Sequence, residues 1–358
     1  MKKNKIIQVI PSLNMGGAEI MCENLSYELK RQNNEVIILS LYNNHTPITE
    51  RMEKKGIKIV YLNKNKGFDL KLLYKIRKFI KEEKPDIIHT HLYSLKYVCL
   101  SLFFKKNIKI IHTVHNIATK ESTKKDQKLN KFIFKKNIAI PVALSEEIQD
   151  TICELYDMNK NMVPIVYNGI NLNNCIEKNN YHIGDKIIIT HVGRFFEQKN
   201  HKGLILSFHE ILKTYNNCEL RLIGNGALLN EIKELVKSLG IDKNVKFLGE
   251  QKEVYQFLNE SDIFIMPSLY EGVPLALIEA MGTGLPIIVS NVGGIKDMVE
   301  NNIDAILIKP NIEEIYNAFN LLINDYMLRK KIGKSAKRRS IEFSVENMEQ
   351  KYSKIYNK

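Results

Sequence analysis

Short runs of apolar residues alternate with amphipathic stretches along most of this chain of 358 residues. The first series of apolar runs covers residues 6–10, 36–41, 57–62, 86–91, 108–115, 138–145 and 163–169. A second series covers residues 186–194, 218–226, 245–250, 262–268 and 285–290. Short apolar runs separated by helical segments, such as residues 20–31, predict parallel strands with helices on both faces of the sheet. The pattern therefore predicts an α/β protein with two doubly wound domains.

A polar, Asn-rich stretch at residues 171–185 separates the two series and is the best candidate for a linker. We place the boundary near Asn179, which gives a first domain at residues 1–178 and a second at 179–340. The tail at residues 343–358 predicts a further helix, because apolar residues recur there at helical spacing. That spacing alone would equally permit a peripheral cap. The recurring residues are Val345, Met348, Tyr352 and Tyr356.

The most informative stretch is residues 266–294, MPSLYEGVPLALIEAMGTGLPIIVSNVGG. Pro274 suits the first position of a short apolar helix, and Gly282 and Gly284 suit its end. Glu279 lies in the middle of that helix, where a carboxylate is costly unless a polar group bonds it. Helix side chains lean toward the N-terminus, so Glu279 should point toward the helix start. The stretch therefore predicts a polar partner for this carboxylate.

The start of the same helix is a candidate phosphate site. Free backbone N–H groups, those of Leu275 and Ala276 among them, meet the positive end of the helix dipole there. A ligand whose phosphate binds these amides and whose hydroxyl groups donate to Glu279 would have the features of a nucleotide.

The segment around the two glutamates, EGVPLALIEAM, resembles the donor-binding signature of retaining glycosyltransferases of family four. The resemblance implies the GT-B fold, in which two Rossmann-like domains face a central cleft and the last helix crosses back to the first domain. It implies an acceptor-binding domain at residues 1–178, a nucleotide-sugar donor-binding domain at 179–340, and a C-terminal helix within 341–358 that packs on the first domain. In that family the second glutamate holds the ribose of a nucleotide sugar, and the first lies at the sugar and is important for transfer. By resemblance these are Glu279 and Glu271, and Gly272 belongs to the same donor-binding segment.

Two further segments resemble donor-binding motifs of the family. The segment HVGRFFEQKN matches a strand-end motif in which an Arg and a Lys meet the donor diphosphate, here Arg194 and Lys199. Two cations suit a departing nucleoside diphosphate, because negative charge grows on it as the glycosidic bond breaks. The segment LIGNG has a Gly turn after a strand, and Gly224 would let the backbone come near the nucleotide.

The first domain contains matches on the acceptor side. The segment MGGAE resembles the glycine loop beneath the diphosphate and acceptor, which implicates Gly16 and Gly17, although adjacent glycines can also make only a tight turn. In HTVHN the family pattern favours His115 over His112 as a catalytic residue near the sugar or acceptor, at a strand end where such sheets bind ligands. Two candidates from family positions facing the cleft are Ser145, which a helix cap would also explain, and Asn168.

No catalytic metal and no cofactor beyond the nucleotide-sugar co-substrate are expected. The chain has no Asp-x-Asp pair, the usual ligand set for a divalent metal on a nucleotide diphosphate. Arg194, Lys199 and the helix amides would then carry the charge of the leaving group.

The net charge of +13 is concentrated in the first domain. Residues 1–178 hold 30 Lys and Arg against 18 Asp and Glu, a net charge of +12. Ten lysines between residues 105 and 136 are mixed with Phe103, Phe104, Phe132 and Phe134. This mixture predicts contact with an anionic membrane surface, and no nucleic-acid motif accompanies it. The alternative is a solvated basic face.

Composition narrows the expected setting to the cytoplasm. No apolar run approaches the eighteen residues of a transmembrane helix, and the N-terminus lacks the length and cleavage site of a secretory signal. The five cysteines are scattered without a CxxC spacing, which predicts neither disulfides nor a zinc cluster. We expect a cytoplasmic protein, peripheral on the inner face of the membrane.

The sequence thus predicts a retaining glycosyltransferase that moves a hexose-type sugar from UDP to a hydroxyl of a glycan or lipid-linked glycan acceptor in cell-surface polysaccharide synthesis, such as that of capsule or lipopolysaccharide. A nucleotide-sugar epimerase and a non-catalytic nucleotide-sugar-binding protein of the same fold stay open as alternatives. A dinucleotide oxidoreductase is disfavoured, because SLNMGGAE lacks the GxGxxG spacing and the second strand ends without an acidic residue.

Overall fold

The computed structural model describes residues 3–14, 16–104 and 108–357, and the chain forms two compact units. Unit 1 comprises Met1–Gly169 and Val345–Lys358, and unit 2 comprises Ile170–Ser344. The division falls after Gly169 rather than near Asn179, because the intervening stretch bonds to unit 2. The N–H of Lys178 donates to the carbonyl of Thr283 at 2.8 Å, and the Asn259 amide donates to the carbonyl of Glu177 at 3.1 Å.

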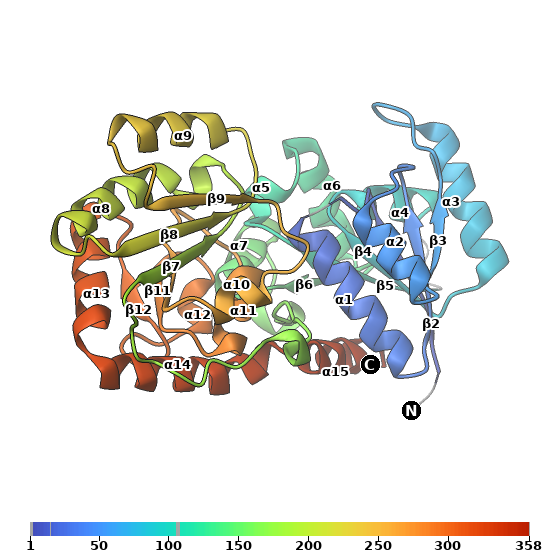
Figure 1. The fold of residues 1–358 in the computed structure, drawn as a ribbon. Helices are drawn as coiled ribbons and strands as arrows, with labels where there is room; N and C mark the ends of the chain where they lie inside the picture. Colours follow the sequence, from blue (N-terminus) through green and yellow to red (C-terminus); the bar gives the residue numbers. More distant parts are fainter. Residues whose placement is uncertain (1–2, 15, 105–107, 358) are drawn as a thin grey trace. The chain divides into compact units, whose positions relative to one another are not determined.

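Unit 1 is built on a six-stranded parallel sheet in the order β3-β2-β1-β4-β5-β6 (Figure 1). Its strands are β1 Lys5–Ile10, β2 Glu35–Ser40, β3 Lys58–Tyr61, β4 Ile87–His91, β5 Lys109–Val114 and β6 Ile140–Ala143. Its helices are α1 Gly17–Arg31, α2 Pro47–Lys54, α3 Leu70–Glu83, α4 Ser94–Ser101, α5 Ala118–Glu121, α6 Lys124–Lys135, α7 Glu146–Tyr156 and α15 Val345–Tyr356. The predicted doubly wound first domain is confirmed.

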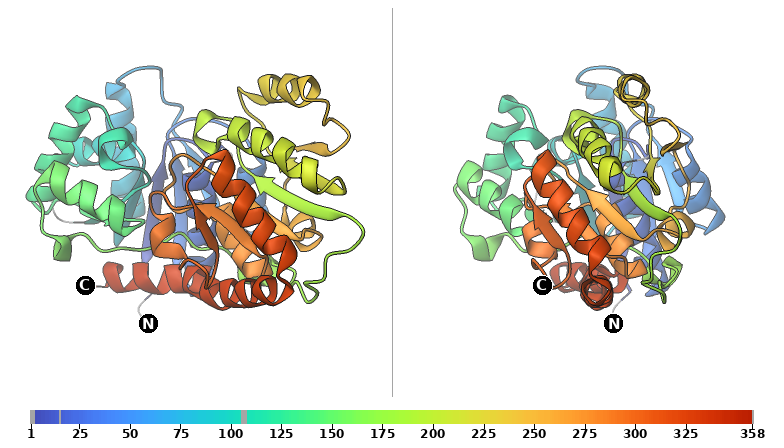
Figure 2. Two further views of the ribbon diagram at one scale, coloured as in Figure 1. Left: turned by 90° about the vertical axis from the view of Figure 1, so that its left-hand side faces the viewer. Right: turned by 60° about the vertical axis from the view of Figure 1, so that its left-hand side comes forward.

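Unit 2 repeats this architecture with a parallel sheet in the order β12-β11-β10-β7-β8-β9. Its strands are β7 Ile187–Val192, β8 Cys218–Ile223, β9 Val245–Gly249, β10 Ile263–Met266, β11 Ile287–Ser290 and β12 Ile306–Ile308. Its helices are α8 His201–Thr214, α9 Leu229–Ser238, α10 Tyr255–Asn259, α11 Leu275–Thr283, α12 Ile295–Met298, α13 Ile312–Asn324 and α14 Tyr326–Ser340. Helices α8 and α13 lie side by side on this sheet (Figure 2), and α11 packs against α14.

Short 3-10 turns connect several of these elements. They are η1 Lys160–Met162, η2 Leu172–Asn174, η3 Glu197–Lys199 and η4 Ile341–Phe343.

Each sheet has one point where the strand order reverses. In unit 1 it lies between β1 and β4, and in unit 2 between β7 and β10. At such a reversal the connections from the two neighbouring strands run in opposite directions, and doubly wound sheets bind their ligands outside the carboxyl ends of those strands. The candidate residues that follow β1, β7 and β10 therefore lie at the two expected positions.

The predicted C-terminal helix is confirmed as α15, and it packs against α1 in unit 1. Every apolar residue of its predicted stripe is buried in the core of that unit, together with Leu25 and Leu29 of α1. The chain thus returns to unit 1 after completing unit 2, and residues 341–344 stay with unit 2. The alternative of a peripheral cap is wrong.

Two short elements differ from the sequence prediction. Residues 163–169 form no strand; only one parallel bridge joins Ile165 to Ala143. Pro164 accepts from the Ala143 N–H at 2.9 Å but has no N–H of its own to donate, so the pairing does not extend. Strand β12, in contrast, was not predicted, because its three residues are too short for a periodic signal.

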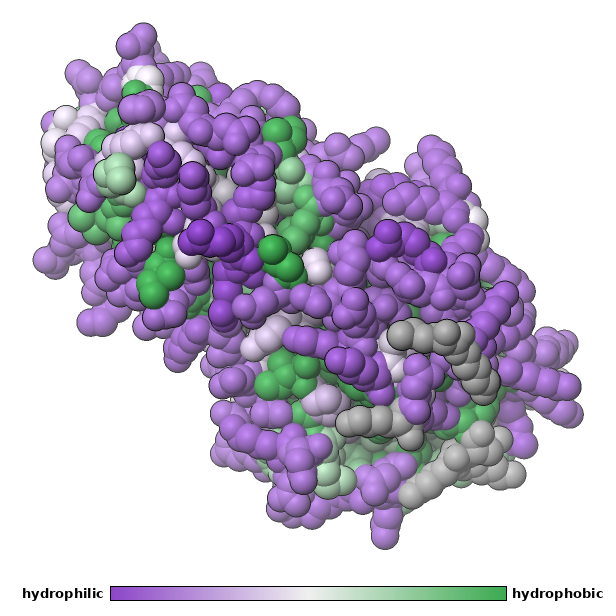
Figure 3. Space-filling model, turned by 90° about the horizontal axis from the view of Figure 1, so that it is seen from below, coloured by the Kyte–Doolittle hydropathy of each residue, from purple (hydrophilic) through white to green (hydrophobic). Residues whose placement is uncertain are grey.

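The face of the molecule shown in Figure 3 is mostly hydrophilic, and its apolar side chains lie in small separate areas. Such scattered apolar residues are usual on exposed surfaces. Within the described ranges, no helix has the length and apolar character needed to cross a membrane.

Candidate active site

The loop after β10 and the start of α11 form the centre of the candidate donor site. Helix α11 begins at Leu275, with Pro274 as the extended residue before it, one position later than predicted. Of the two glycines predicted at its end, Gly284 ends the helix in the left-handed conformation at φ 81°, whereas Gly282 lies within the helix. No described residue accepts a hydrogen bond from the N–H of Leu275 or Ala276. The helix start therefore offers two amide donors to an anion.

Glu279 lies on α11 in a partly buried position. Burial raises the pKa of its carboxyl to about 8, because taking the charged form out of water is costly. The charge of Glu279 acts on Tyr255 and Cys175, whose pKa values are raised by burial first and by this carboxylate second. The expectation that a polar group of the chain reaches this carboxylate is wrong for the described residues, none of which donates a hydrogen bond to it. Its oxygens are thus left for hydroxyl groups of a ligand.

Glu271 and Lys199, two predicted catalytic residues, lie in direct contact. The Lys199 ammonium is 2.6 Å from Oε1 of Glu271, and Gln198 Nε2 donates to the other oxygen at 3.2 Å. The Lys199 side chain is 15% exposed and that of Glu271 is 5% exposed, so solvent screens the pair weakly. Because Lys199 ends the turn η3 after β7, the pair joins the loops at the strand-order reversal of unit 2.

Arg194 follows β7 in the same unit. Its guanidinium lies over the ring of Phe196, 5.3 Å from the ring centroid, and its side chain is exposed. Among the residues that the structure describes, no carboxylate pairs with it. Of the two predicted diphosphate-binding cations, Arg194 therefore has no ion-pair partner among the described residues, and Lys199 is paired with the carboxylate of Glu271.

Two glycines of the predicted donor site lie in loops of unit 2. Gly224 has φ 143°, and a Cβ there would overlap the carbonyl oxygen of Gly193. The Phe195 N–H also donates to the Asn225 carbonyl at 3.0 Å, so the loops after β7 and β8 are in contact. The close approach of these two loops is enough to explain why position 224 requires a glycine, so a bound nucleotide is not needed to explain it. Gly272 is partly exposed beside Glu271.

On the unit 1 side, the glycine pair stands at the start of α1. Gly16 caps the helix with an extended backbone, and its carbonyl accepts from the Ile20 N–H at 3.0 Å. Gly17 is the first helical residue, and a Cβ there would meet no atom within 4 Å. The space around Gly17 is thus open.

The two histidines of HTVHN have different surroundings. His112 is 1% exposed and its Nδ1 is 2.9 Å from the Thr90 hydroxyl. His115 lies just beyond β5, is partly exposed, and its Nε2 is 3.0 Å from Nδ1 of His91. Burial lowers the pKa of His112 to about 4 and that of His115 to about 3, and the charge of His112 contributes to the lower value. Both rings are therefore neutral at pH 7, and His115 is the more accessible one.

The remaining acceptor-side candidates are buried. Ser145 precedes α7, and its hydroxyl accepts from the Ile148 N–H at 3.2 Å, so the structure gives it the helix-cap role that the sequence left open. Asn168 is 4% exposed and stands before Gly169, whose carbonyl accepts from the Asn24 amide at 3.0 Å.

Sequence reasoning missed several polar residues that lie beside the candidate residues of each unit. Gln198 was hidden beside Lys199, Gln8 stood inside an apolar strand, and His91 ended the strand IIHTH behind another histidine. His191 and His201 lie behind the turn that carries Arg194, and Nε2 of His191 and both ring nitrogens of His201 are buried without a partner. For most of these residues, the only feature of the sequence that could have indicated a role was a polar residue within or at the end of an apolar run.

The described residues contain no group of three or more His, Cys, Asp or Glu side chains arranged to hold a metal ion. Metal-independent transfer remains a prediction.

Comparisons with known proteins identify the class. The structure resembles a glycosyltransferase from Rickettsia africae, with a TM-score of 0.86 and 22% identity over 100% of this chain and 98% of that one. It also resembles the Anabaena protein HepE in complex with UDP and glucose, with a TM-score of 0.85 and 18% identity over 99% of both chains. These similarities define the fold as that of GT-B glycosyltransferases.

Sequence comparisons identify the family. Residues 15–174 match Glycosyltransferase Family 4, and residues 175–339 match Glycosyl transferases group 1. The chain is 32% identical over 285 residues to an Escherichia coli UDP-Gal:alpha-D-GlcNAc-diphosphoundecaprenol alpha-1,3-galactosyltransferase, covering 73% of this chain and 72% of that enzyme. It is 27% identical to the Staphylococcus aureus capsular polysaccharide biosynthesis glycosyltransferase CapH, over 80% of this chain and 81% of CapH. This chain belongs to the retaining glycosyltransferases of family four, as the resemblance predicted.

Proposed function

We propose that this chain transfers a hexose-type sugar from UDP to a hydroxyl of a glycan or lipid-linked glycan during cell-surface polysaccharide synthesis. Unit 2 binds the donor and unit 1 binds the acceptor. The observation that carries the proposal is a set of unsatisfied polar groups in the described part of unit 2. Two helix amides, the Glu279 carboxylate and the Arg194 guanidinium have no hydrogen-bond or ion-pair partner among the described residues, and they match the diphosphate and ribose of a nucleotide sugar.

The Lys199–Glu271 ion pair gives the two residues complementary roles. When the donor binds, its diphosphate competes with Glu271 for the Lys199 ammonium. Release from the ammonium leaves Glu271 able to accept hydrogen bonds from hydroxyls of the transferred sugar. Arg194 and Lys199 then offset the charge that grows on the departing diphosphate, which is the interaction that speeds such a step.

Transfer with retention needs no dedicated protein base. The bond between the anomeric carbon and the diphosphate oxygen breaks, and the acceptor oxygen bonds to that carbon from the same face. The acceptor proton passes to the departing diphosphate oxygen. The chain's contribution is to hold the diphosphate in place and to stabilise its charge.

Relatives favour UDP as the nucleotide and a lipid-linked acceptor. The E. coli relative is named for galactose transfer from UDP-Gal to a GlcNAc-diphosphoundecaprenol, and the HepE structure holds UDP and glucose. A polyprenyl diphosphate would place the acceptor at the cytoplasmic membrane, where we expect the protein to be peripheral.

The distribution of lysine and phenylalanine in unit 1 supports this location. We define the basic-aromatic surface by Phe103, Phe104 and Phe132, with Lys124, Lys125, Lys128 and Lys131 of α6. Phe103 is 66% exposed and Phe132 is 47% exposed, and the rings of Phe104 and Phe132 meet edge to face. Phe134, which the sequence grouped with them, lies in the core, so its assignment to this surface is wrong. Lys105 and Lys106 lie outside the described residues.

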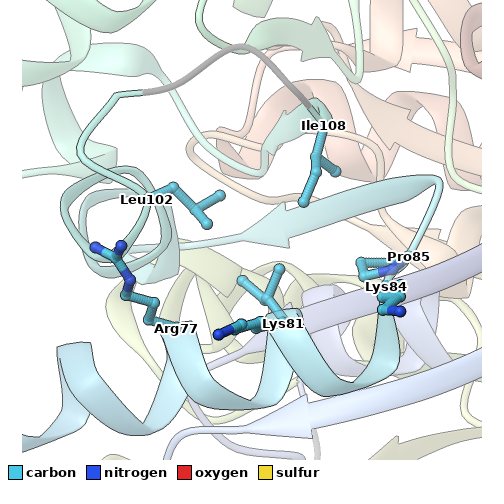
Figure 4. A pocket seen from close by; sticks show the side chains of 7 residues that line it. Arg77, Lys81, Lys84, Pro85, Leu102 and Ile108 are labelled. Atoms are coloured by element: carbon cyan, nitrogen blue, oxygen red, sulfur yellow. The ribbon is translucent and has the colours of Figure 1, made fainter.

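Unit 1 also contains a pocket of about 410 Å³ (Figure 4). Its apolar lining includes Ile80 and Leu102, and its cations are Arg77, Lys81 and Lys84, none of which has an ion-pair partner within the described ranges. Arg77 lies 4.5 Å from the ring centroid of Phe103, which connects the pocket to the basic-aromatic surface. Cations beside apolar side chains suit lipid head groups and the carbon atoms next to them.

A ligand-detected NMR screen of nucleotide sugars against the full chain tests the donor assignment. We expect saturation transfer to the ribose and uracil protons of a UDP-sugar, and loss of that transfer in Glu279→Ala. Selective binding of NAD would refute the proposal. An anomeric coupling constant of the product that matches the donor's would support retention, and conversion of the donor without acceptor would support the epimerase alternative.

A further inference from the structure

A buried chain of hydrogen bonds ends on His115. Its Nε2 is 3.0 Å from Nδ1 of His91, and Nε2 of His91 is 2.7 Å from Oε1 of Gln8. The chain continues into α1, where Gln8 Nε2 donates to the Ser26 hydroxyl at 3.0 Å and that hydroxyl donates to the Cys22 carbonyl at 2.6 Å. Gln8, Ser26 and His91 are all 0% exposed, so no solvent competes with these bonds.

The direction of every bond in this chain follows from its α1 end. Because the single proton of Ser26 is committed to the Cys22 carbonyl, its oxygen must accept from Gln8. The amide nitrogen of Gln8 therefore faces Ser26, and its oxygen faces His91. A carbonyl oxygen only accepts, so His91 carries its proton on Nε2.

The same reasoning fixes the proton of His115. A neutral His91 that is protonated on Nε2 has a bare Nδ1, and that nitrogen can only accept. His115 must then donate from Nε2, which leaves its own Nδ1 unprotonated. No described residue is hydrogen-bonded to this Nδ1.

Burial keeps the relay neutral and fixed in orientation. Desolvation and the neighbouring histidines hold the pKa of His91 well below its ordinary value, so the ring does not gain a second proton near neutral pH. His89 packs against it with ring centroids 4.4 Å apart. His89 is itself held by the Tyr356 hydroxyl at 2.8 Å and the Thr113 hydroxyl at 2.8 Å. Helix α15 thus supports the ring that orients His115.

We propose that Gln8 and His91 are positioning residues that hold His115 in the Nε2–H tautomer, so that its Nδ1 accepts a hydrogen bond from a hydroxyl of the sugar or the acceptor. The identity of that hydroxyl rests on the proposed function. The tautomer of His115 follows from the hydrogen bonds alone and does not depend on the proposed function. In the opposite tautomer, Nδ1 of His115 would carry the proton and act as a donor. A ligand hydroxyl could then only accept a hydrogen bond from it.

The ring nitrogens of full-length protein labelled with ¹⁵N-histidine test the tautomer directly. Long-range ¹H–¹⁵N correlation spectra distinguish protonated from bare ring nitrogens, and the His115 signals are assigned by their loss in His115→Gln. We expect a protonated Nε2 and a bare Nδ1 at pH 7. A protonated Nδ1 on His115 would overturn the proposal, whether or not the protein transfers sugar.

Variants test whether the relay matters for turnover. His91→Phe keeps a ring but removes the acceptor, and we expect it to lower kcat/KM about 10- to 100-fold, by analogy with the loss of partners that orient metal-binding histidines. His91→Asn can place its side-chain oxygen near the position of Nδ1 and should recover part of that loss. His112→Phe is the matched control, because it changes an equally buried histidine that does not bond to His115.

Equal losses in His91→Phe and His112→Phe, with no recovery in His91→Asn, would mean that His91 serves only packing. If no nucleotide sugar is turned over at all, the proposed function fails while the spectrum of the unsubstituted protein still decides the relay.

Discussion

Glu279→Gln should make the folded chain more stable and bind the donor more weakly. The structure predicts the first effect because burial raises the pKa of the Glu279 carboxyl from 4.5 to about 8. Between these two pH values the folded protein keeps a proton that the unfolded chain releases. The free energy of unfolding of the unsubstituted protein must therefore fall as pH rises through this window. Glutamine cannot ionise and removes this contribution.

The size of the stability effect follows from the same two pKa values. At pH 7 the unfolded carboxyl is ionised and the folded one is mostly protonated, a difference worth up to about 3 kcal/mol at about 1.4 kcal/mol per pH unit. The gain should vanish near pH 4, where both states are protonated. The second effect has the opposite sign for function and appears above pH 8, where the folded carboxyl is ionised. There, loss of the charged hydrogen bond to a ribose hydroxyl costs about 1.5–3 kcal/mol of donor affinity.

Urea unfolding followed by circular dichroism between pH 4.5 and 8, and calorimetric titration with UDP above pH 8, measure the two effects. Glu234→Gln on the exposed side of α9 is a matched control that should change neither. If Glu279→Gln raises the free energy of unfolding by the same amount at every pH, the claim that the folded protein holds this carboxyl protonated would be refuted. Unchanged UDP affinity would remove Glu279 from the donor site.

Three further predictions concern turnover and location. Glu271→Ala should lower kcat more than donor affinity, because its partner in the reaction is the transferred sugar; unaltered kcat with an intact circular dichroism spectrum would refute that role. Arg194→Ala and Lys199→Ala should each slow turnover by about 2.7–4 kcal/mol of transition-state stabilisation, and EDTA should have little effect; activity abolished by EDTA and restored by Mg²⁺ or Mn²⁺ would refute metal independence. Replacing four lysines of α6 by glutamate should abolish sedimentation with anionic liposomes and leave turnover on a soluble acceptor largely intact, because each lysine near the surface contributes about 1 kcal/mol. High salt should weaken that sedimentation, and absence of binding by the unsubstituted protein at low salt would leave only a solvated basic face. The four lysines are Lys124, Lys125, Lys128 and Lys131.

The strand and helix order could be predicted because buried parallel strands leave a strong apolar pattern. Eleven of the twelve strands overlap predicted runs, and the exception, β12, is only three residues long. The run that failed, residues 163–169, contains Pro164, whose missing N–H limits pairing in a way that apolar periodicity does not register.

The candidate site was predicted as separate motifs, and the contacts between them were not. Lys199 and Glu271 are 72 positions apart, and only the strand order β10-β7 brings their loops together. The phase of α6 likewise separates Phe132, which is exposed, from Phe134, which is in the core. Neither arrangement can be read from composition or spacing, because both depend on which face of an element meets its neighbour.

The relay behind His115 shows a further limit. Gln8 looks like an isolated polar residue in β1, and His91 looks like one more polar residue at the end of β4; their partnership depends on the register in which those strands pair. A polar residue inside an apolar strand predicts a buried hydrogen bond but not its partner.

Acceptor-dependent release of UDP is the measurement that tests the central claim most directly. Purified full-length protein is incubated with each of several UDP-sugars, with and without glycan-diphosphate lipid acceptors in anionic vesicles, and free UDP is quantified. We expect UDP release from one sugar donor only when a matching acceptor is present, and strongly reduced release in Glu271→Ala. Absence of UDP release with every donor and acceptor pair, while UDP-sugar still binds, would contradict the transferase account and favour a non-catalytic nucleotide-sugar-binding protein.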